Sequence, residues 1–318
     1  MSATRFRVLP SAYAQAARDR HRRERNKGLL IIAFTLPGMA LFLLFVLMPI
    51  LQSGYFSLYD WNGFGPLTDY VGLENYERLL NDRIFQASVR HSFIIMLLSV
   101  FIQLPIALGL ALLVGRGTLR GKWFFRTILF IPYVFSEVIT ALIWRYVMHP
   151  RGGLLNVVLE TFIPGFEPVG WLAERNIALF GVFIVLTWKY FGFYMILYMA
   201  GLQSINTELE DAARVDGATE PQVLRFITLP LIGSTIRLTI FLSVVGSFQQ
   251  FVLVWVLTQG GPVNASELIA TYLYKFGLTR FALGYGSAVA VVLFAITLVF
   301  SLGYQRLIMK QDFAASRA

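Results

Sequence analysis

Residues 208–230, with the sequence ELEDAARVDGATEPQVLRFITLP, form a charged segment between two long apolar runs, 177–202 and 231–257. The residues before Gly217 are good or acceptable helix formers, and Glu220-Pro221 puts a proline where a new helix can begin. Gly217 lies between them, and glycine tolerates the positive φ of a bend. The segment therefore predicts two short helices that meet at Gly217.

The composition is that of a membrane protein. Of the 318 residues, 57% are hydrophobic and 14% are charged, whereas about a quarter of the residues of a soluble domain are charged. A span of about 20 apolar residues crosses a bilayer core, so we expect an all-α, polytopic bundle of about six transmembrane helices. Prolines within these runs predict kinks. The six runs lie near 29–52, 88–114, 126–148, 177–202, 231–257 and 281–307, and the prolines are Pro37, Pro49, Pro105 and Pro132.

The positive charges predict the orientation. Seventeen of the 27 Lys and Arg residues fall in the two tails and in loops 115–126 and 203–230, and six fall in the loops on the opposite side. Because Lys and Arg are enriched in cytoplasmic loops, both termini and the 208–230 segment are expected in the cytoplasm. The predicted organisation is a basic tail at 1–28, a transmembrane domain at 29–309 with a loop at 203–230, and a tail at 310–318. The basic tail adjoins a span, which favours lipid headgroups over nucleic acid.

The spacing of Asp211-Ala212-Ala213, Gly217, Ile227 and Leu229-Pro230 resembles the EAA loop of the membrane subunits of bacterial ABC importers. In that family the loop is a coupling helix that docks on a cytoplasmic ATPase. Asp211 stands where the family has Glu, and Glu210 precedes it, so which acid makes the ion pair is open. The resemblance implies this set of coupling residues: Glu210, Asp211, Ala212, Ala213, Asp216, Gly217, Ile227, Leu229 and Pro230.

Three segments on the opposite side resemble the sugar-importer branch of the same family. They are residues 58–83, 141–156 and 256–278, in that order along the chain. The first also contains a stretch, 74–80, that predicts a short amphipathic helix. With the coupling loop, the resemblance covers most of the chain after about residue 30.

The sequence carries no pattern for catalysis or metal binding. A P-loop is absent, because 115–123 lacks a glycine at the required interval and has Trp123 in place of the hydroxyl that binds Mg²⁺. The three His residues are far apart and there is no Cys. We therefore expect no enzyme activity, metal or cofactor in this chain; ATP and Mg would be bound by partner ATPase subunits.

Polar groups deep in spans are costly in lipid and usually face the protein interior or water. One helix face in each span beside the 208–230 segment is polar and aromatic, which suits a sugar. Tight helix packing is the alternative for the small residues. The alternatives for Lys189 are an ion pair with a neighbouring carboxylate or a place at an interface. Glu137 could pair with Arg145 or Arg237, or contact a ligand. The predicted substrate pathway comprises Leu186, Lys189, Tyr190, Phe193, Ser243, Gly246, Ser247 and Gln250.

The resemblance implies the permease subunit of an ATP-driven importer that moves a mono- or oligosaccharide across a bacterial inner membrane by alternating access. Its expected partners are a second, homologous permease subunit, two cytoplasmic ABC ATPase subunits and an extracytoplasmic solute-binding protein. A non-sugar polar solute, such as a glycerol phosphodiester, is the alternative within this class. An ion-coupled secondary transporter is the alternative from another class, and would often show two related halves, which this sequence lacks.

Overall fold

The computed structural model describes residues 26–27, 30–115 and 121–310. The predicted tails at 1–28 and 310–318 lie outside these ranges except for residues 26–27 and 310. Contacts divide the chain into two units, Met1–Tyr55 and Phe56–Ala318. The first unit contains most of one apolar helix, Leu30–Phe56, which includes η1 (Leu43–Leu47) and α2 (Met48–Phe56).

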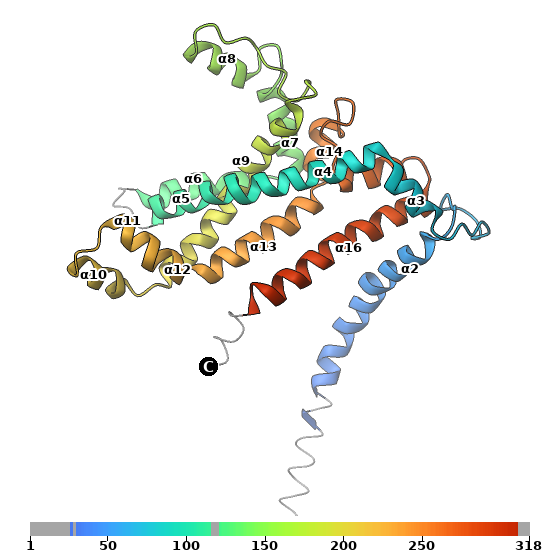
Figure 1. Cartoon of the computed structure of the whole chain (residues 1–318), viewed down its shortest axis with the longest axis horizontal. Coiled ribbons are helices and arrows are strands. Elements are labelled where there is room, and N and C mark those ends of the chain that lie inside the picture. The colour runs from blue at the N-terminus through green and yellow to red at the C-terminus, as the bar shows by residue number, and fades with distance from the viewer. Residues whose placement is uncertain (1–25, 28–29, 116–120, 311–318) are drawn as a thin grey trace, which may run out of the picture. The chain divides into compact units, whose positions relative to one another are not determined.

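The second unit is built from helices (Figure 1). Four single helices of the described residues, counting Leu30–Phe56, are long and apolar enough to span a membrane, and two bent pairs raise the number to six. The prediction of an all-α bundle with about six spans is confirmed. The remaining helices are α3 (Glu74–Asn81), α4 (Arg83–Leu98), η2 (Ser99–Gln103), α5 (Leu104–Gly115), α6 (Lys122–Val134), α7 (Glu137–Val147), α8 (Leu154–Phe162), α9 (Ala178–Gln203), α10 (Thr207–Val215), α11 (Glu220–Val223), η3 (Leu224–Thr228), α12 (Leu229–Leu231), α13 (Gly233–Gln249), α14 (Val252–Thr258), α15 (Ile269–Tyr272), η4 (Leu273–Leu278) and α16 (Leu283–Leu307).

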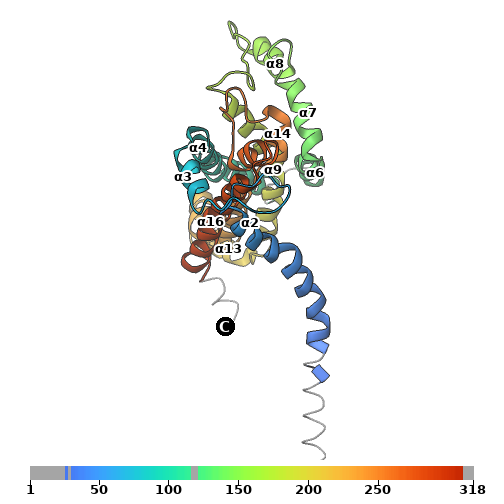
Figure 2. The same ribbon diagram turned by 90° about the vertical axis from the view of Figure 1, so that its right-hand side faces the viewer.

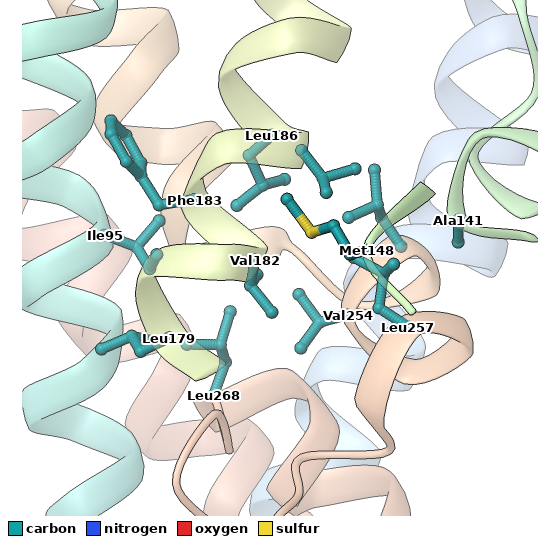
Figure 3. Close-up of a cluster of buried hydrophobic side chains, with 12 residues drawn as sticks. Ile95, Ala141, Met148, Leu179, Val182, Phe183, Leu186, Val254, Leu257 and Leu268 are labelled. Carbon is teal, nitrogen blue, oxygen red and sulfur yellow. The ribbon is translucent and has the colours of Figure 1, made fainter. Parts of the chain in front are cut away.

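Helix α9 is the centre of this unit. It packs against α5 and α6 and also touches α4, α7 and α13, while α13 packs against α4 and α16 (Figures 1 and 2). One apolar cluster fills the space between α4, α9 and α14 (Figure 3). In that view Ile95 of α4 lies on one side of α9, and Val254 and Leu257 of α14 lie on the other.

The third predicted span, 126–148, is broken, which corrects the expectation of one kinked helix. Helix α6 ends at Val134, α7 begins at Glu137, and the two axes differ by 100°. Ser136 caps the new helix, its Oγ accepting a hydrogen bond from the Ile139 amide at 3.2 Å. The backbone carbonyls at the end of α6 accept hydrogen bonds from the side chain of Lys189, which lies in α9.

The fifth predicted span, 231–257, is not one helix either. Helix α13 ends at Gln249, and Gln250 and Phe251 are not helical before α14 begins. The Phe251 ring packs against Tyr274 with centroids 5.0 Å apart and stacks on Trp255. At its other end the span bends by 69° between Glu220–Leu231 and Gly233–Gln249.

Three of the π-helical stretches end two residues before a proline. The stretch η1 precedes Pro49, η2 precedes Pro105 and η3 precedes Pro230. A proline in a helix has no N–H and clashes with the carbonyl four residues earlier. In a π-turn a carbonyl accepts from the N–H five residues later instead of four. Two of the predicted kinks, at Pro49 and Pro105, are therefore adjoined by widened turns.

Candidate functional site

A cavity of about 180 Å³ opens between α4, η2, α6, α9 and α13. We call it the interhelical cavity. Seven of the eight residues predicted for the substrate pathway line it, and Lys189 does not. Its lining residues are Ile95, Ser99, Gln103, Tyr133, Leu186, Tyr190, Phe193, Tyr194, Leu242, Ser243, Gly246, Ser247 and Gln250.

The sequence reasoning missed the contribution of the second and third spans. Ser99 and Gln103 are both buried, and they lie four residues apart in the second span. The rule that selected α9 and α13, a polar group deep in a span, would have found them. Tyr133 of α6 stacks on Phe193 of α9 with ring centroids 4.8 Å apart.

Gly246 distinguishes between the two interpretations of the small residues of α13. A Cβ added to Gly246 would meet nothing within 4 Å, so this glycine is not at a tight helix contact. By contrast, a Cβ on Gly192 of α9 would lie 2.2 Å from the Leu129 carbonyl oxygen of α6. The close helix contact is thus at Gly192, and Gly246 leaves space in the cavity.

Several polar groups of the cavity donate their hydrogens to the protein itself. Tyr190 OH donates to Glu137 Oε1 at 2.5 Å, Ser247 Oγ donates to the Ser243 carbonyl at 2.8 Å, and Gln103 Nε2 donates to the Leu186 carbonyl at 3.1 Å. Gln250 Oε1 is buried and has no hydrogen-bond partner among the residues that the structure describes. The cavity therefore presents acceptor oxygens together with the hydroxyl groups of Ser99, Ser243 and Tyr194.

Lys189, also predicted for the pathway, is not among the residues that line this cavity, and its Nζ lies 5.6 Å from the ring centroid of Tyr133 and 6.0 Å from that of Tyr190. Its side chain is 4% exposed, and Nζ donates to the carbonyls of Pro132 at 3.4 Å, Tyr133 at 2.9 Å and Phe135. These carbonyls end α6 and have lost their helical partners. The ammonium caps the broken span. For Glu137 the sequence left three partners open, namely Arg145, Arg237 or a ligand. In the structure its carboxylate accepts a hydrogen bond from Tyr190 OH.

The 208–230 segment forms the two predicted helices. Asn206 caps α10, its Oδ1 accepting from the Glu208 amide at 3.1 Å, and Gly217 has a φ of +89°. Arg214 Nε donates to Glu220 Oε1 at 2.7 Å, which joins α10 to α11. This hydrogen bond lowers the pKa of the Glu220 carboxyl and raises that of the Arg214 guanidinium.

The two neighbouring acids of this segment have different surroundings. Glu210 is 3% exposed, and its Oε1 accepts a hydrogen bond from Thr228 Oγ1 at 2.6 Å. Asp211 is exposed and pairs with Arg214 Nη1 at 2.7 Å. Three apolar side chains of the same segment are exposed: Leu209 at 50%, Phe226 at 67% and Val215 at 88%.

Residues 11–311 match the family described as the binding-protein-dependent transport system inner membrane component. The chain belongs to this family. The permease is 36% identical over 276 residues to a probable ABC transporter permease protein of Pyrococcus horikoshii, covering 86% of this chain and 94% of that one. It is 32% identical over 303 residues to the diacetylchitobiose uptake system permease protein NgcF of Streptomyces coelicolor, covering 92% and 86%.

A solved structure shares the fold. It is the crystal structure of a bacterial alginate ABC transporter in complex with an alginate pentasaccharide-bound periplasmic protein, with a TM-score of 0.76, 25% identity and coverage of 90% of this chain and 96% of that one. The prediction of an ABC importer permease is thereby confirmed. The chain is a multi-pass, inner-membrane transport component of the binding-protein-dependent class.

Proposed function

We propose that this permease imports a sugar through the interhelical cavity by alternating access, driven by ATP. The observation that carries the proposal is a stacked aromatic pair, Tyr133 and Phe193, in a cavity with acceptor oxygens. Aromatic faces stack on the C–H faces of sugars, and oxygens accept from their hydroxyls. Relatives support the solute class, since two of them are named as permeases for lactose, 33% identical, and for trehalose and maltose, 32% identical.

The proposed assembly places this chain in a bacterial inner membrane beside a second, homologous permease subunit. Two cytoplasmic ATPase subunits would bind ATP and Mg below them, and a solute-binding protein would deliver the sugar from outside. Leu209, Val215 and Phe226 are exposed on the 208–230 segment, which supports a protein partner there, because a partner would remove these apolar side chains from water.

The coupling path would run from α10 into the cavity. The Glu210–Thr228 hydrogen bond ties α10 to η3, and the Arg214–Glu220 ion pair ties it to α11. The chain then continues through α12 into α13, which supplies Ser243, Gly246 and Ser247 to the cavity. ATPase closure that pushes α10 would therefore move one wall of the cavity.

Substitutions at Gly217 and Asp211 test the coupling role. We expect Asp211→Lys to abolish sugar uptake while the protein stays in the membrane, since it reverses an exposed charge on α10. Gly217→Val should also abolish uptake, because a β-branched residue rarely adopts positive φ. Gly217→Asn, which tolerates positive φ, is the matched control for backbone strain.

The measurement is uptake of radiolabelled lactose, maltose, trehalose and diacetylchitobiose by cells that carry the complete transporter. Immunoblots of membrane fractions verify the amount of permease. Loss of uptake in Gly217→Val but not in Gly217→Asn would show that Gly217 is needed for its positive φ. Loss of uptake in both variants would show that any side chain at this position blocks docking of the partner. Normal accumulation by Asp211→Lys and Gly217→Val cells would refute the coupling role.

A further inference from the structure

We infer that a second, basic cavity at the start of α4 binds the headgroup of an anionic phospholipid, with phosphatidylglycerol as the type that fits its chemistry. This basic cavity has a volume of about 540 Å³. It lies between the start of α4, residues 175–176 before α9 and residues 263–265 after α14. It shares no lining residue with the interhelical cavity, so the inference does not depend on which solute is transported.

Three arginines from two separate segments give the basic cavity its charge. Arg83 and Arg90 lie seven residues, or about two turns, apart on one side of α4, and Arg175 precedes α9. All three are exposed, and among the residues that the structure describes none of them pairs with a carboxylate. The lining contains no Asp or Glu. An anion would therefore supply the counter-charge that these guanidinium groups lack.

The guanidinium group is also the donor that suits a phosphate. Its N–H groups form a rigid, planar fork that can give two parallel hydrogen bonds to phosphate oxygens, and such charge-assisted bonds are about twice as strong as neutral ones. Several guanidinium groups around one hollow can share the oxygens of one phosphodiester. The chemistry of the arginines thus favours a phosphate over an uncharged ligand.

Two neutral polar side chains of the basic cavity suit the rest of a glycerol headgroup. Lys275 Nζ donates to Asn264 Oδ1 at 2.8 Å, which leaves the amide nitrogen of Asn264 as a donor for a ligand. His91 is 9% exposed, and its Nδ1 lies 3.1 Å from the Glu267 carbonyl oxygen. Because a carbonyl only accepts, Nδ1 carries the hydrogen, and Nε2 of the neutral ring is an acceptor. A glycerol hydroxyl can donate to this nitrogen.

The depth of the basic cavity matches the level of lipid headgroups. The first exposed large apolar side chain of α4 is Phe93, 41% exposed and three residues after Arg90, and Leu97 follows at 48%. On α9 the first is Phe180, 51% exposed and five residues after Arg175. Exposed apolar side chains of a span face the hydrocarbon, and arginines at its edge reach the headgroups.

This placement favours a lipid over an anion from solution. Helices α4 and α9 contact each other, so both sets of exposed apolar side chains begin below the same cavity. A phospholipid would cover Phe93, Leu97 and Phe180 with its acyl chains while its phosphate contacts the arginines. A carboxylate of a solute-binding protein would reach the arginines from the water and leave these side chains uncovered.

The experiment measures lipid binding by the purified, full-length permease in a neutral, sugar-free detergent, with microscale thermophoresis. The probes are dioleoyl phosphatidylglycerol, dioleoyl phosphatidylcholine, the free headgroup glycerophosphoglycerol and inorganic phosphate. We expect phosphatidylglycerol to bind at least about tenfold more tightly than phosphatidylcholine, whose choline cation faces the arginines. It should bind at least about 100-fold more tightly than the two soluble anions, which lack acyl chains.

Variants of exposed arginines test the assignment to the basic cavity. Arg90→Gln and Arg175→Gln should each weaken phosphatidylglycerol binding about tenfold and leave phosphatidylcholine binding unchanged. Arg90→Lys keeps the charge but loses the planar fork, so we expect a loss of about threefold. Arg151→Gln removes the same charge from an exposed turn after α7, outside the basic cavity, and should change neither affinity. Thermal unfolding midpoints verify that each variant is folded.

Equal affinity for the two lipids would overturn the inference. Unchanged phosphatidylglycerol binding by folded Arg90→Gln and Arg175→Gln would place the lipid elsewhere and overturn the site. Glycerophosphoglycerol binding as tight as that of the lipid would show that the basic cavity takes a free anion. Loss of solute-binding-protein docking in folded Arg90→Gln, with unchanged lipid binding, would assign the arginines to that protein instead.

Discussion

At position 189, one ammonium group stabilises the end of a helix that belongs to another span. Three carbonyl groups at the end of α6 accept from Lys189 Nζ, and the side chain is buried. The sequence showed a cation in a span, which is a polar group in need of a partner. It could not show that the partners are backbone carbonyls more than fifty residues away, because that depends on how α6 and α9 pack.

We predict that Lys189→Met lowers thermal stability in detergent. Methionine has a similar length but donates no hydrogen bond, so the carbonyls of Pro132, Tyr133 and Phe135 lose this partner, at a cost of about 1–3 kcal/mol for each one left buried and unpaired. Lys189→Arg should be less destabilising, because the guanidinium still donates. The measurement is the unfolding midpoint of the purified permease, with Lys122→Met, at an exposed position, as the control. Equal midpoints for Lys189→Met and wild type would rule out a capping role.

At the scale of helices, proline and glycine determine the shapes of the spans in different ways. The sequence predicted that prolines mark irregularities, and π-turns precede Pro49, Pro105 and Pro230. It did not predict the breaks after Val134 and Gln249, because these depend on Lys189 and on rings brought together by the fold. The two helices around Gly217 followed from local sequence alone and are confirmed.

Two glycines should respond oppositely to the same added methyl group. Gly192→Ala would place a Cβ 2.2 Å from the Leu129 carbonyl, which forces α6 and α9 apart at a cost of about 1–3 kcal/mol. Gly246→Ala meets nothing within 4 Å, so we expect stability within about 0.5 kcal/mol of wild type. It should instead weaken sugar binding, since it narrows the cavity. Thermal unfolding and calorimetry of both variants measure this, and destabilisation by Gly246→Ala alone would contradict the packing described.

At the scale of the whole molecule, the pattern of the spans was predictable, but the polarity of the cavity was not. Seven of the eight residues predicted from helical spacing on α9 and α13 line the interhelical cavity. The spacing was sufficient because residues on one face of a helix point in the same direction in the folded protein. The hydrogen-bond directions of Tyr190 and Gln103 depend on Glu137 and Leu186, which come from other parts of the chain. Periodicity carries no information on such contacts.

The predicted orientation can be tested by labelling, because the chain has no cysteine. Val215→Cys lies on the exposed part of α10, and Glu160→Cys lies on exposed α8. We expect a membrane-impermeant maleimide to label Glu160→Cys from outside intact spheroplasts and to reach Val215→Cys only after lysis. Labelling of Val215→Cys in intact spheroplasts would invert the topology and remove the 208–230 segment from any cytoplasmic ATPase.

The π-helical turn η2 changes which residues of the second span share a helix face. A π-turn closes its ring over one more residue than an α-turn does, so the helix faces on either side of Ser99–Gln103 are out of phase with each other. A single helical wheel drawn through Arg83–Gly115 therefore mixes residues that face the cavity with residues that do not. Removing one residue from this turn while replacing Pro105 would restore a common phase, and it would rotate α5 about the helix axis relative to α4.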